Sequence, residues 1–99
     1  MTVEILDKAE NDLVNGFVFY EEQQQGLGTY FRESLFADID SLRILGGAHR
    51  AVYRQFHRAL ANRFPFAIFY TVANETVYIQ AVVDCRREPA WIKRHLHDA

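Results

Sequence analysis

The sequence predicts an α+β fold in which a helical hairpin packs on a mainly antiparallel four-stranded sheet, with the element order β-α-α-β-β-β-α. Up to residue 45, apolar side chains recur at helical spacing, with one glycine-containing break. From residue 52 onward, they alternate or run continuously, as they do in strands. The 99 residues have the length of one domain, and we expect residues 1–99 to form a single one.

The first half of the chain is predicted to hold one short strand and two helices. The apolar start at Val3–Leu6 is typical of an edge strand. Asp7 and Glu10 match a capping box, so we expect the first helix to begin there and to end before Gly26. A second helix is predicted over Thr29–Leu45, and the short break between the helices predicts an antiparallel hairpin.

The second half of the chain changes to the patterns of strands. The alternating residues Val52–Leu60 predict one strand of mixed polarity, and Phe64–Val72 predict a central strand that is apolar on both faces. A polar link leads to a strand at Thr76–Val83, which forms a β-hairpin with the central strand. A short helix over Glu88–Leu96 follows, and Pro89 suits its first turn.

The net charge of −2 hides an uneven distribution along the chain. Residues 1–49 carry nine acids against three bases, and residues 50–99 carry eight bases against four acids, so the two halves have net charges of −6 and +4. The second half therefore either presents a basic face to an anionic ligand or carries solvated arginines at a sheet edge.

The sequence also bears on where the protein acts. It opens with Met1–Glu4 and no signal-peptide pattern follows, and no apolar run approaches the roughly 20 residues of a membrane span. We therefore expect a cytoplasmic protein with no membrane partner.

Cysteine and histidine supply little evidence for catalysis or metal binding. Cys85 is the single cysteine, which excludes an internal disulfide and a cysteine-based zinc cluster. Its neighbours Asp84 and Arg86 act in opposite directions on a thiol pKa, so a residue at a strand end is favoured over a nucleophile. His95 and His97 are two positions apart on a predicted helix and do not face the same side. We expect no metal and no other cofactor.

The arginines of the second half are the main candidate functional residues. Five of them lie on or beside predicted strands: Arg54, Arg58, Arg63, Arg86 and Arg87. Arg54 and Arg58 are four positions apart, which places them on one strand face. If the strands are neighbours, the guanidinium groups converge on the sheet face away from the helices, where they can bind nucleic acid or an acidic peptide, or stabilise phosphoryl charge. Tyrosines accompany them: Tyr53, Tyr70 and Tyr78.

Two stretches, FYEEQQQGLGTYFRESL and NRFPFAIFYTVANETVYIQAVVDCRREP, add a further indication. They combine a polar helix end, a Gly-Leu-Gly turn, an Arg-Phe-Pro-Phe entry into an apolar strand, a short hairpin and an Arg-Arg-Glu-Pro close. In this order, and over Leu6 to Pro89, the chain resembles the RelE/ParE superfamily of toxins, often called plasmid stabilization proteins.

The resemblance implies the toxin of a type II toxin–antitoxin module. Such a toxin is held inactive by a cognate antitoxin, which lays a helix or an extended segment along it and binds operator DNA; the toxin would meet that DNA only through the antitoxin. The RelE-like branch cuts messenger RNA on the ribosome, whereas the ParE-like branch poisons DNA gyrase.

One departure from the family pattern decides between these branches. Asp84 and Cys85 stand where many relatives carry histidine before the Arg-Arg close, and no tyrosine follows the last strand. A nuclease would then lack an evident general acid, so a ParE-like action on gyrase is favoured. RNA cleavage is the alternative, with these implied catalytic residues: Arg58, Arg63 and Arg86. An inactive relative that only binds its antitoxin is the second alternative. The residues implied in antitoxin or target binding are Arg54, Arg58, Arg63, Tyr70, Asp84, Arg86 and Arg87.

Overall fold

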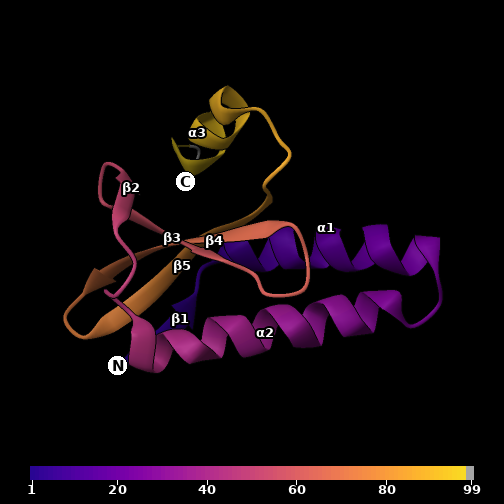
Figure 1. Cartoon of the computed structure of the whole chain (residues 1–99), viewed down its shortest axis with the longest axis horizontal. Helices are drawn as coiled ribbons and strands as arrows, with labels where there is room; N and C mark the ends of the chain where they lie inside the picture. Colours follow the sequence, from indigo (N-terminus) through magenta and orange to yellow (C-terminus); the bar gives the residue numbers. More distant parts are fainter. Residues whose placement is uncertain (98–99) are drawn as a thin grey trace.

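The computed structural model describes residues 1–97, which form five strands and three helices around one sheet (Figure 1). The elements follow in the order β1 (Thr2–Ile5), α1 (Asp7–Gln23), α2 (Leu27–Leu45), β2 (Ala51–Tyr53), β3 (Phe56–Leu60), β4 (Phe66–Ala73), β5 (Thr76–Asp84) and α3 (Pro89–His97). The predicted α+β class and helical hairpin are confirmed. The predicted strand number is wrong, because the sheet has five strands rather than four.

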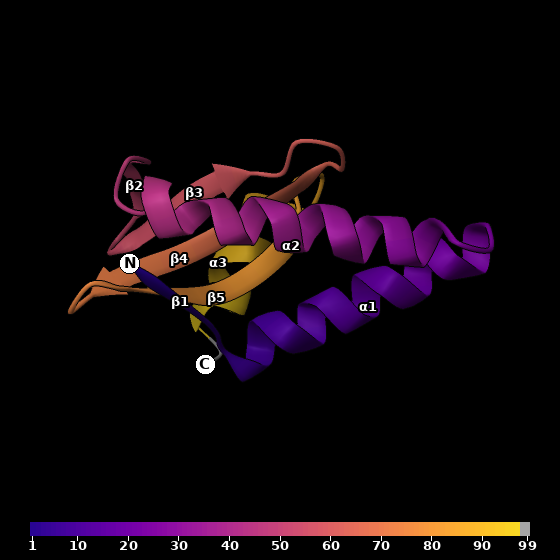
Figure 2. The same ribbon diagram turned by 90° about the horizontal axis from the view of Figure 1, so that it is seen from below.

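The strands lie side by side in the order β1-β5-β4-β3-β2. Neighbouring strands are antiparallel except for β1, which runs parallel to β5 with Thr2 opposite Thr76. Helices α1 and α2 run along one face of the sheet, and α3 lies on the other face (Figures 1 and 2). The sheet thus separates an acidic hairpin from a short helix that contains no acid.

The extra strand arises within the segment predicted as a single strand, Val52–Leu60. A tight turn at Arg54 and Gln55 divides this segment into β2 and β3, with Tyr53 paired to Phe56. Arg54 has a φ of 51°, in the left-handed region that favours glycine or asparagine. Because the turn contains neither residue, it could not be predicted from the sequence.

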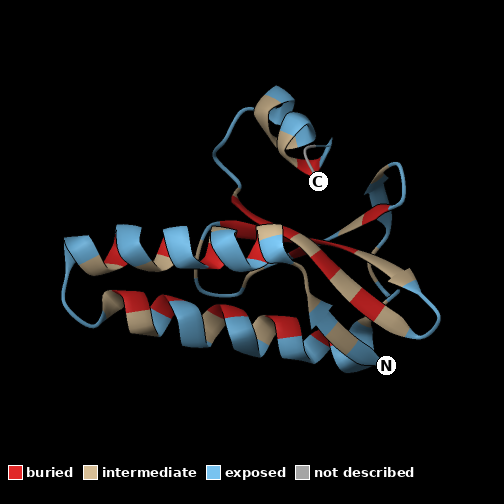
Figure 3. Cartoon of the chain, turned by 180° about the vertical axis from the view of Figure 1, so that it is seen from behind, coloured by how far each residue is buried: buried red, intermediate tan, exposed pale blue. Residues whose placement is uncertain are grey.

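The hairpin side of the sheet contains the larger part of the core (Figure 3). From α2 it receives a stripe of buried residues at helical spacing: Phe31, Leu35, Ile39 and Leu42. These pack against buried side chains of the two central strands: Ile68, Tyr70, Val77 and Ile79. Burial of such a stripe, rather than helix propensity, is the main source of stability for a helix of this kind.

An irregularity in β5 lets its residues serve both faces of the sheet. Phe69 pairs with Ala81 but Tyr70 pairs with Ile79, so Gln80 is the extra residue of a β-bulge. Ile79 therefore joins the core under the hairpin, whereas Ala81, two positions later, joins the cluster under α3. That second cluster also holds Leu96, the buried residue of α3.

The capping box predicted at Asp7 and Glu10 does not form at the start of α1. Leu6 occupies the cap position of α1 without a side-chain hydrogen bond, and Asp7 is the first helical residue, where its charge still favours the helix dipole. The start of α2 is capped from the preceding helix instead. The carboxylate of Glu21 accepts hydrogen bonds from the backbone N–H groups of Gly26 (3.0 Å) and Gly28 (2.9 Å).

Candidate partner-binding groove and basic residues

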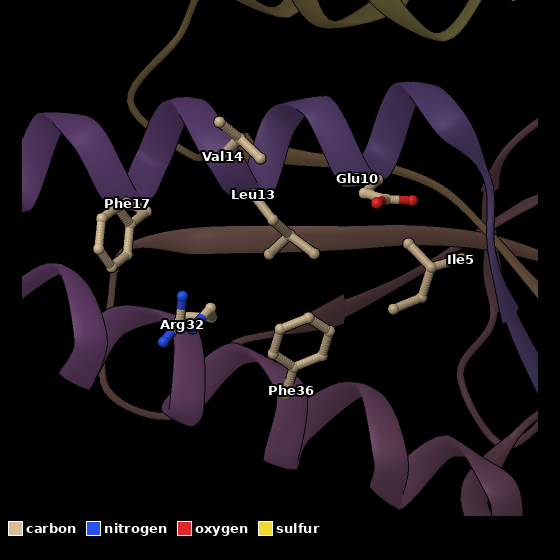
Figure 4. Close-up of a pocket in the computed structure, with 7 residues that line it drawn as sticks. All are labelled: Ile5, Glu10, Leu13, Val14, Phe17, Arg32 and Phe36. Carbon is tan, nitrogen blue, oxygen red and sulfur yellow. The ribbon is translucent and has the colours of Figure 1, made fainter.

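A groove of about 450 Å³ lies between α1 and α2 on the outer side of the hairpin. It is lined by Ile5, Glu10, Leu13, Val14, Phe17, Arg32 and Phe36. In Figure 4, Leu13, Phe17, Arg32, Phe36 and Ile5 surround the space between the two helices and β1, and Val14 and Glu10 lie on α1 at its edge. Five of the seven are apolar, and Val14 and Phe36 are 54% and 42% exposed. Such exposure of large apolar side chains around one groove is typical of a surface that another apolar surface covers.

Charged groups edge this apolar floor. The guanidinium group of Arg32 lies 5.0 Å from the ring centre of Phe17, and Glu10 lies near the opposite end of the groove (Figure 4). Residues 7–45, which form the hairpin, carry eight acids and three bases. The groove is thus an apolar trough in a surface of net negative charge, and it suits the apolar side of an amphipathic helix with basic flanks.

The predicted convergence of arginines on the sheet is wrong. Arg63 lies in the β3–β4 loop and donates a hydrogen bond of 3.0 Å to the hydroxyl of Tyr30 on α2. Arg86 follows β5 and is bound to Asp84, with its Nη2 2.6 Å from Asp84 Oδ2. These hydrogen bonds hold the pKa of the Asp84 carboxyl below its usual range, against the opposing effect of partial burial. Two of the three arginines proposed for catalysis therefore have partners elsewhere.

The remaining predicted residues are also dispersed. Arg54 lies in the β2–β3 turn with its guanidinium group 5.5 Å from the Tyr53 ring centre, and so does not share a strand face with Arg58. Arg87 lies 4.2 Å from the ring centre of Trp91. Tyr70 is fully buried and cannot stack on a ligand. Arg63 is held by a residue 33 positions away, whereas the contacts of Arg54, Arg86 and Arg87 are with residues at most four positions away. In each case a contact outside the strand pattern directs the guanidinium group.

Cys85 and the two predicted helical histidines have no evident catalytic arrangement. Desolvation and the neighbouring Asp84 carboxylate raise the pKa of the Cys85 thiol, which disfavours the reactive thiolate. His95 bonds to Asp12, and His97 bonds through Nε2 to the hydroxyl of Tyr53. Among residues 1–97, no group of three or more histidine, cysteine, aspartate and glutamate side chains is arranged to hold a metal ion.

Two groups of residues were missed from the sequence. One is the pair Asp12 and His95, which joins α1 to α3. The other is a depression lined by His49, Arg50 and Arg58 at the β2–β3 edge. Arg58 and His95 were considered in the sequence for other roles, but neither grouping carries a sequence signal, because its members are brought together by the packing of elements. In residues 1–97, no helix combines the length and the apolar character needed to cross a membrane.

This arrangement defines an α+β protein with a RelE/ParE-like fold, as the sequence resemblance predicted. Among solved structures, the chain is similar to one from the structure described as "Chromosomal ParDE TA system from P. aeruginosa", with a TM-score of 0.78. The similarity covers 85% of this chain and 95% of the other, at 14% sequence identity. No protein-family model matches the sequence, and no curated protein matches it significantly. The similarity at this level of identity establishes the fold.

Proposed function

We propose that this protein is the toxin of a type II toxin–antitoxin module, ParE-like in action, which inhibits growth through DNA gyrase and is neutralised by a cognate antitoxin. The observation that carries the proposal is the structural similarity to a chain of a ParDE system over almost the whole of that chain. The quoted sequence motifs support the same assignment independently.

The groove between α1 and α2 supports an antitoxin partner. It offers an apolar floor about as long as two helical turns, from Glu10 to Phe17 along α1, within an acidic surface. An antitoxin helix with apolar residues at positions i, i+3 or i+4 and i+7, flanked by lysine or arginine, complements both properties. Any contact with operator DNA belongs to the antitoxin in this proposal.

The dispersion of the arginines supports a gyrase target over messenger RNA. Cleavage of RNA requires charged and acid–base groups around one phosphate, within hydrogen-bond reach of it. Arg63 is directed to Tyr30 and Arg86 to Asp84, so with Arg58 they do not form such a group. A toxin that acts by binding its target needs no such arrangement, and the C-terminal region with its basic residues is the proposed target contact.

Expression of the chain with and without the product of the neighbouring reading frame tests the antitoxin proposal. We expect the chain alone to stop growth and the second protein to restore it. Val14→Asp and Phe36→Asp introduce a charge into the groove and should abolish the rescue while growth arrest persists. Ile44→Asp is the matched control, because Ile44 is 89% exposed on α2 outside the groove lining. If the second protein restores growth equally with all three variants, the antitoxin binds outside this groove.

A second experiment separates the possible targets. The purified chain should inhibit gyrase supercoiling and stabilise cleaved DNA in the presence of gyrase, and transcripts in arrested cells should stay intact at early times. Early cleavage of transcripts at ribosomes would establish RNA cleavage instead. A chain that binds its partner yet leaves growth, gyrase and transcripts unaffected would be an inactive, antitoxin-binding relative.

A further inference from the structure

The outer face of the helical hairpin leaves large apolar side chains exposed around the groove between α1 and α2. Val14 and Phe36, which line the groove, are 54% and 42% exposed. Val18 follows Val14 by one turn of α1, on the same side of the helix, and is 47% exposed. The apolar surface therefore continues from the groove along the outer side of α1.

The groove also carries one acid and one base, and these lie at opposite ends of it. Glu10 is near the end where β1 meets α1, whereas Arg32 lies at the other end, with its guanidinium group 5.0 Å from the ring centre of Phe17 (Figure 4). Both residues are exposed, and within residues 1–97 neither forms an ion pair. The groove is thus neutral as a whole and offers one unpaired charge of each sign.

The other acids of the hairpin lie outside the groove lining. Four of them are engaged by other groups of the same chain: Asp12 by His95 and Val82, Glu21 by Gly26 and Gly28, Asp38 by Asn62, and Asp40 by Arg43. Glu33 lines a separate depression between α2 and the β3–β4 loop. The net negative charge of the hairpin is therefore set apart from the groove, and salt screens it beyond about 8 Å.

A two-fold axis that crosses the groove at right angles makes this face complementary to itself. Such an axis packs two hairpins face to face with their helices antiparallel, so each end of the groove lies over the opposite end of the second copy's groove. Glu10 of each copy then meets Arg32 of the other, and the apolar rims meet near the axis. The four helices form a bundle in which both charges at the ends are paired.

We propose that this chain, in the absence of another partner, forms a symmetric dimer through the groove between α1 and α2. An apolar centre with charges at its rim is the usual composition of such an interface. With α1 about 25 Å long and the helix pair about 20 Å wide, each copy buries roughly 500 Å². The total of about 1,000 Å² is at the low end for specific interfaces, so we expect a weak dimer with a dissociation constant in roughly the micromolar range.

The dimer does not depend on the proposed antitoxin, but it bears on how an antitoxin would bind. A second copy and an antitoxin helix occupy the same groove, so each excludes the other. If the antitoxin binds there more tightly than a second copy does, its addition separates the dimer by mass action.

Sedimentation velocity of the purified full chain, at concentrations from about 1 to about 100 µM, measures the dimer. We expect the unmodified chain to change from monomer to dimer over this range. Glu10→Arg brings two bases together at each end of the groove, and Arg32→Glu brings two acids together, so each variant alone should stay monomeric. A mixture of the two variants should form the dimer again, because one copy then carries a base at both positions and the other an acid at both.

Glu33→Arg is the matched control, since it makes the same change of charge at an exposed residue of α2 outside the groove lining. It should dimerise as the unmodified chain does, and circular dichroism should show every variant folded. The proposal is overturned if the unmodified chain stays monomeric, if Glu10→Arg or Arg32→Glu alone dimerises like Glu33→Arg, or if their mixture stays monomeric. Because the chain is measured alone, the result is independent of whether an antitoxin binds.

Discussion

His95 Nε2 lies 2.9 Å from Asp12 Oδ1, a contact that joins α3 to α1 across 83 positions of the sequence. The other oxygen of the same carboxylate accepts the backbone N–H of Val82, on β5, at 2.9 Å. Lys8 donates from α1 to the backbone carbonyl of His95. One partly buried carboxylate therefore links three elements and fixes the last helix against the sheet.

Replacing Asp12 should weaken this link in a graded manner. Asp12→Ala leaves the Val82 N–H without its acceptor and should lower the free energy of unfolding by about 1–3 kcal/mol. Asp12→Asn keeps an amide oxygen that can accept the Val82 N–H, but removes the charge that faces His95. This variant should therefore lose less free energy of unfolding than Asp12→Ala. Urea denaturation measures both, and hydrogen exchange in α3 should speed up in the alanine variant. Unchanged unfolding of Asp12→Ala would contradict the role of this carboxylate.

Close packing at the start of α2 yields a second prediction. A Cβ at Gly28 would lie 2.6 Å from the backbone oxygen of Phe17 on α1, an atom that cannot turn aside as a side chain can. Gly28→Ala should therefore push the helices apart and lower the free energy of unfolding by about 1–3 kcal/mol, although alanine favours a helix. Thermal unfolding measures the loss.

Gly26→Ala is the comparison for this variant. Gly26 has a φ of 89° and nothing within 4 Å of an added Cβ, so alanine there adds backbone strain without a collision. The strain should cost about 1 kcal/mol and leave the spacing of the helices unchanged. Near-ultraviolet circular dichroism reports the packing of the aromatic side chains in both variants. If Gly28→Ala keeps the same spectrum as Gly26→Ala, the close approach of the helices at Gly28 does not require glycine.

The parts of the fold that were predicted correctly are those in which a pattern repeats over many residues. The stripe from Phe31 to Leu42 marks α2 because four buried positions recur at helical spacing. The hairpin of β4 and β5 was found because two long apolar strands flank a short polar link. The division between β2 and β3 was missed, because a turn without glycine at Arg54 leaves the alternation of side chains almost uninterrupted.

The candidate site was predicted less well than the fold, because its residues are set by tertiary contacts. Arg63 bonds to Tyr30, 33 positions earlier, and the groove is formed by side chains of two helices and a strand. His49 was not singled out because a lone histidine after a Gly-Gly pair has no distinguishing pattern. Its position over the buried hydroxyl of Tyr70 appears only once the sheet is assembled.

The ion pair of Asp84 and Arg86 predicts a dependence of stability on pH. Hydrogen bonds from Arg86 lower the pKa of Asp84 in the folded state below the ordinary aspartate value of about 3.9. The folded chain therefore binds fewer protons than the unfolded chain in this range, and stability falls as the pH drops through the folded pKa. The contribution is fully present above about pH 4.

Asp84→Asn tests this origin of the acid sensitivity. It should be less stable than the unmodified chain at neutral pH, but should lose less stability between neutral and strongly acidic solution. Arg86→Gln removes the other partner of the same ion pair, and should also reduce the dependence of the free energy of unfolding on pH. Urea unfolding at a series of pH values measures both. Profiles parallel to that of the unmodified chain would mean that other carboxyl groups account for the whole acid dependence.

The turn between β4 and β5 offers a substitution that should stabilise the fold. Asn74 and Glu75 have φ values of 51° and 60°, the left-handed pair required by a type I′ turn. Asparagine tolerates this conformation, whereas glutamate at the second position is strained, and Asn-Gly is the preferred pair. Glu75→Gly should therefore raise the free energy of unfolding by about 1 kcal/mol, and Glu75→Ala, which removes the carboxylate but keeps a Cβ, should not. Denaturant unfolding of the two variants separates backbone strain from charge, and equal stability of both would show that strain at Glu75 is negligible.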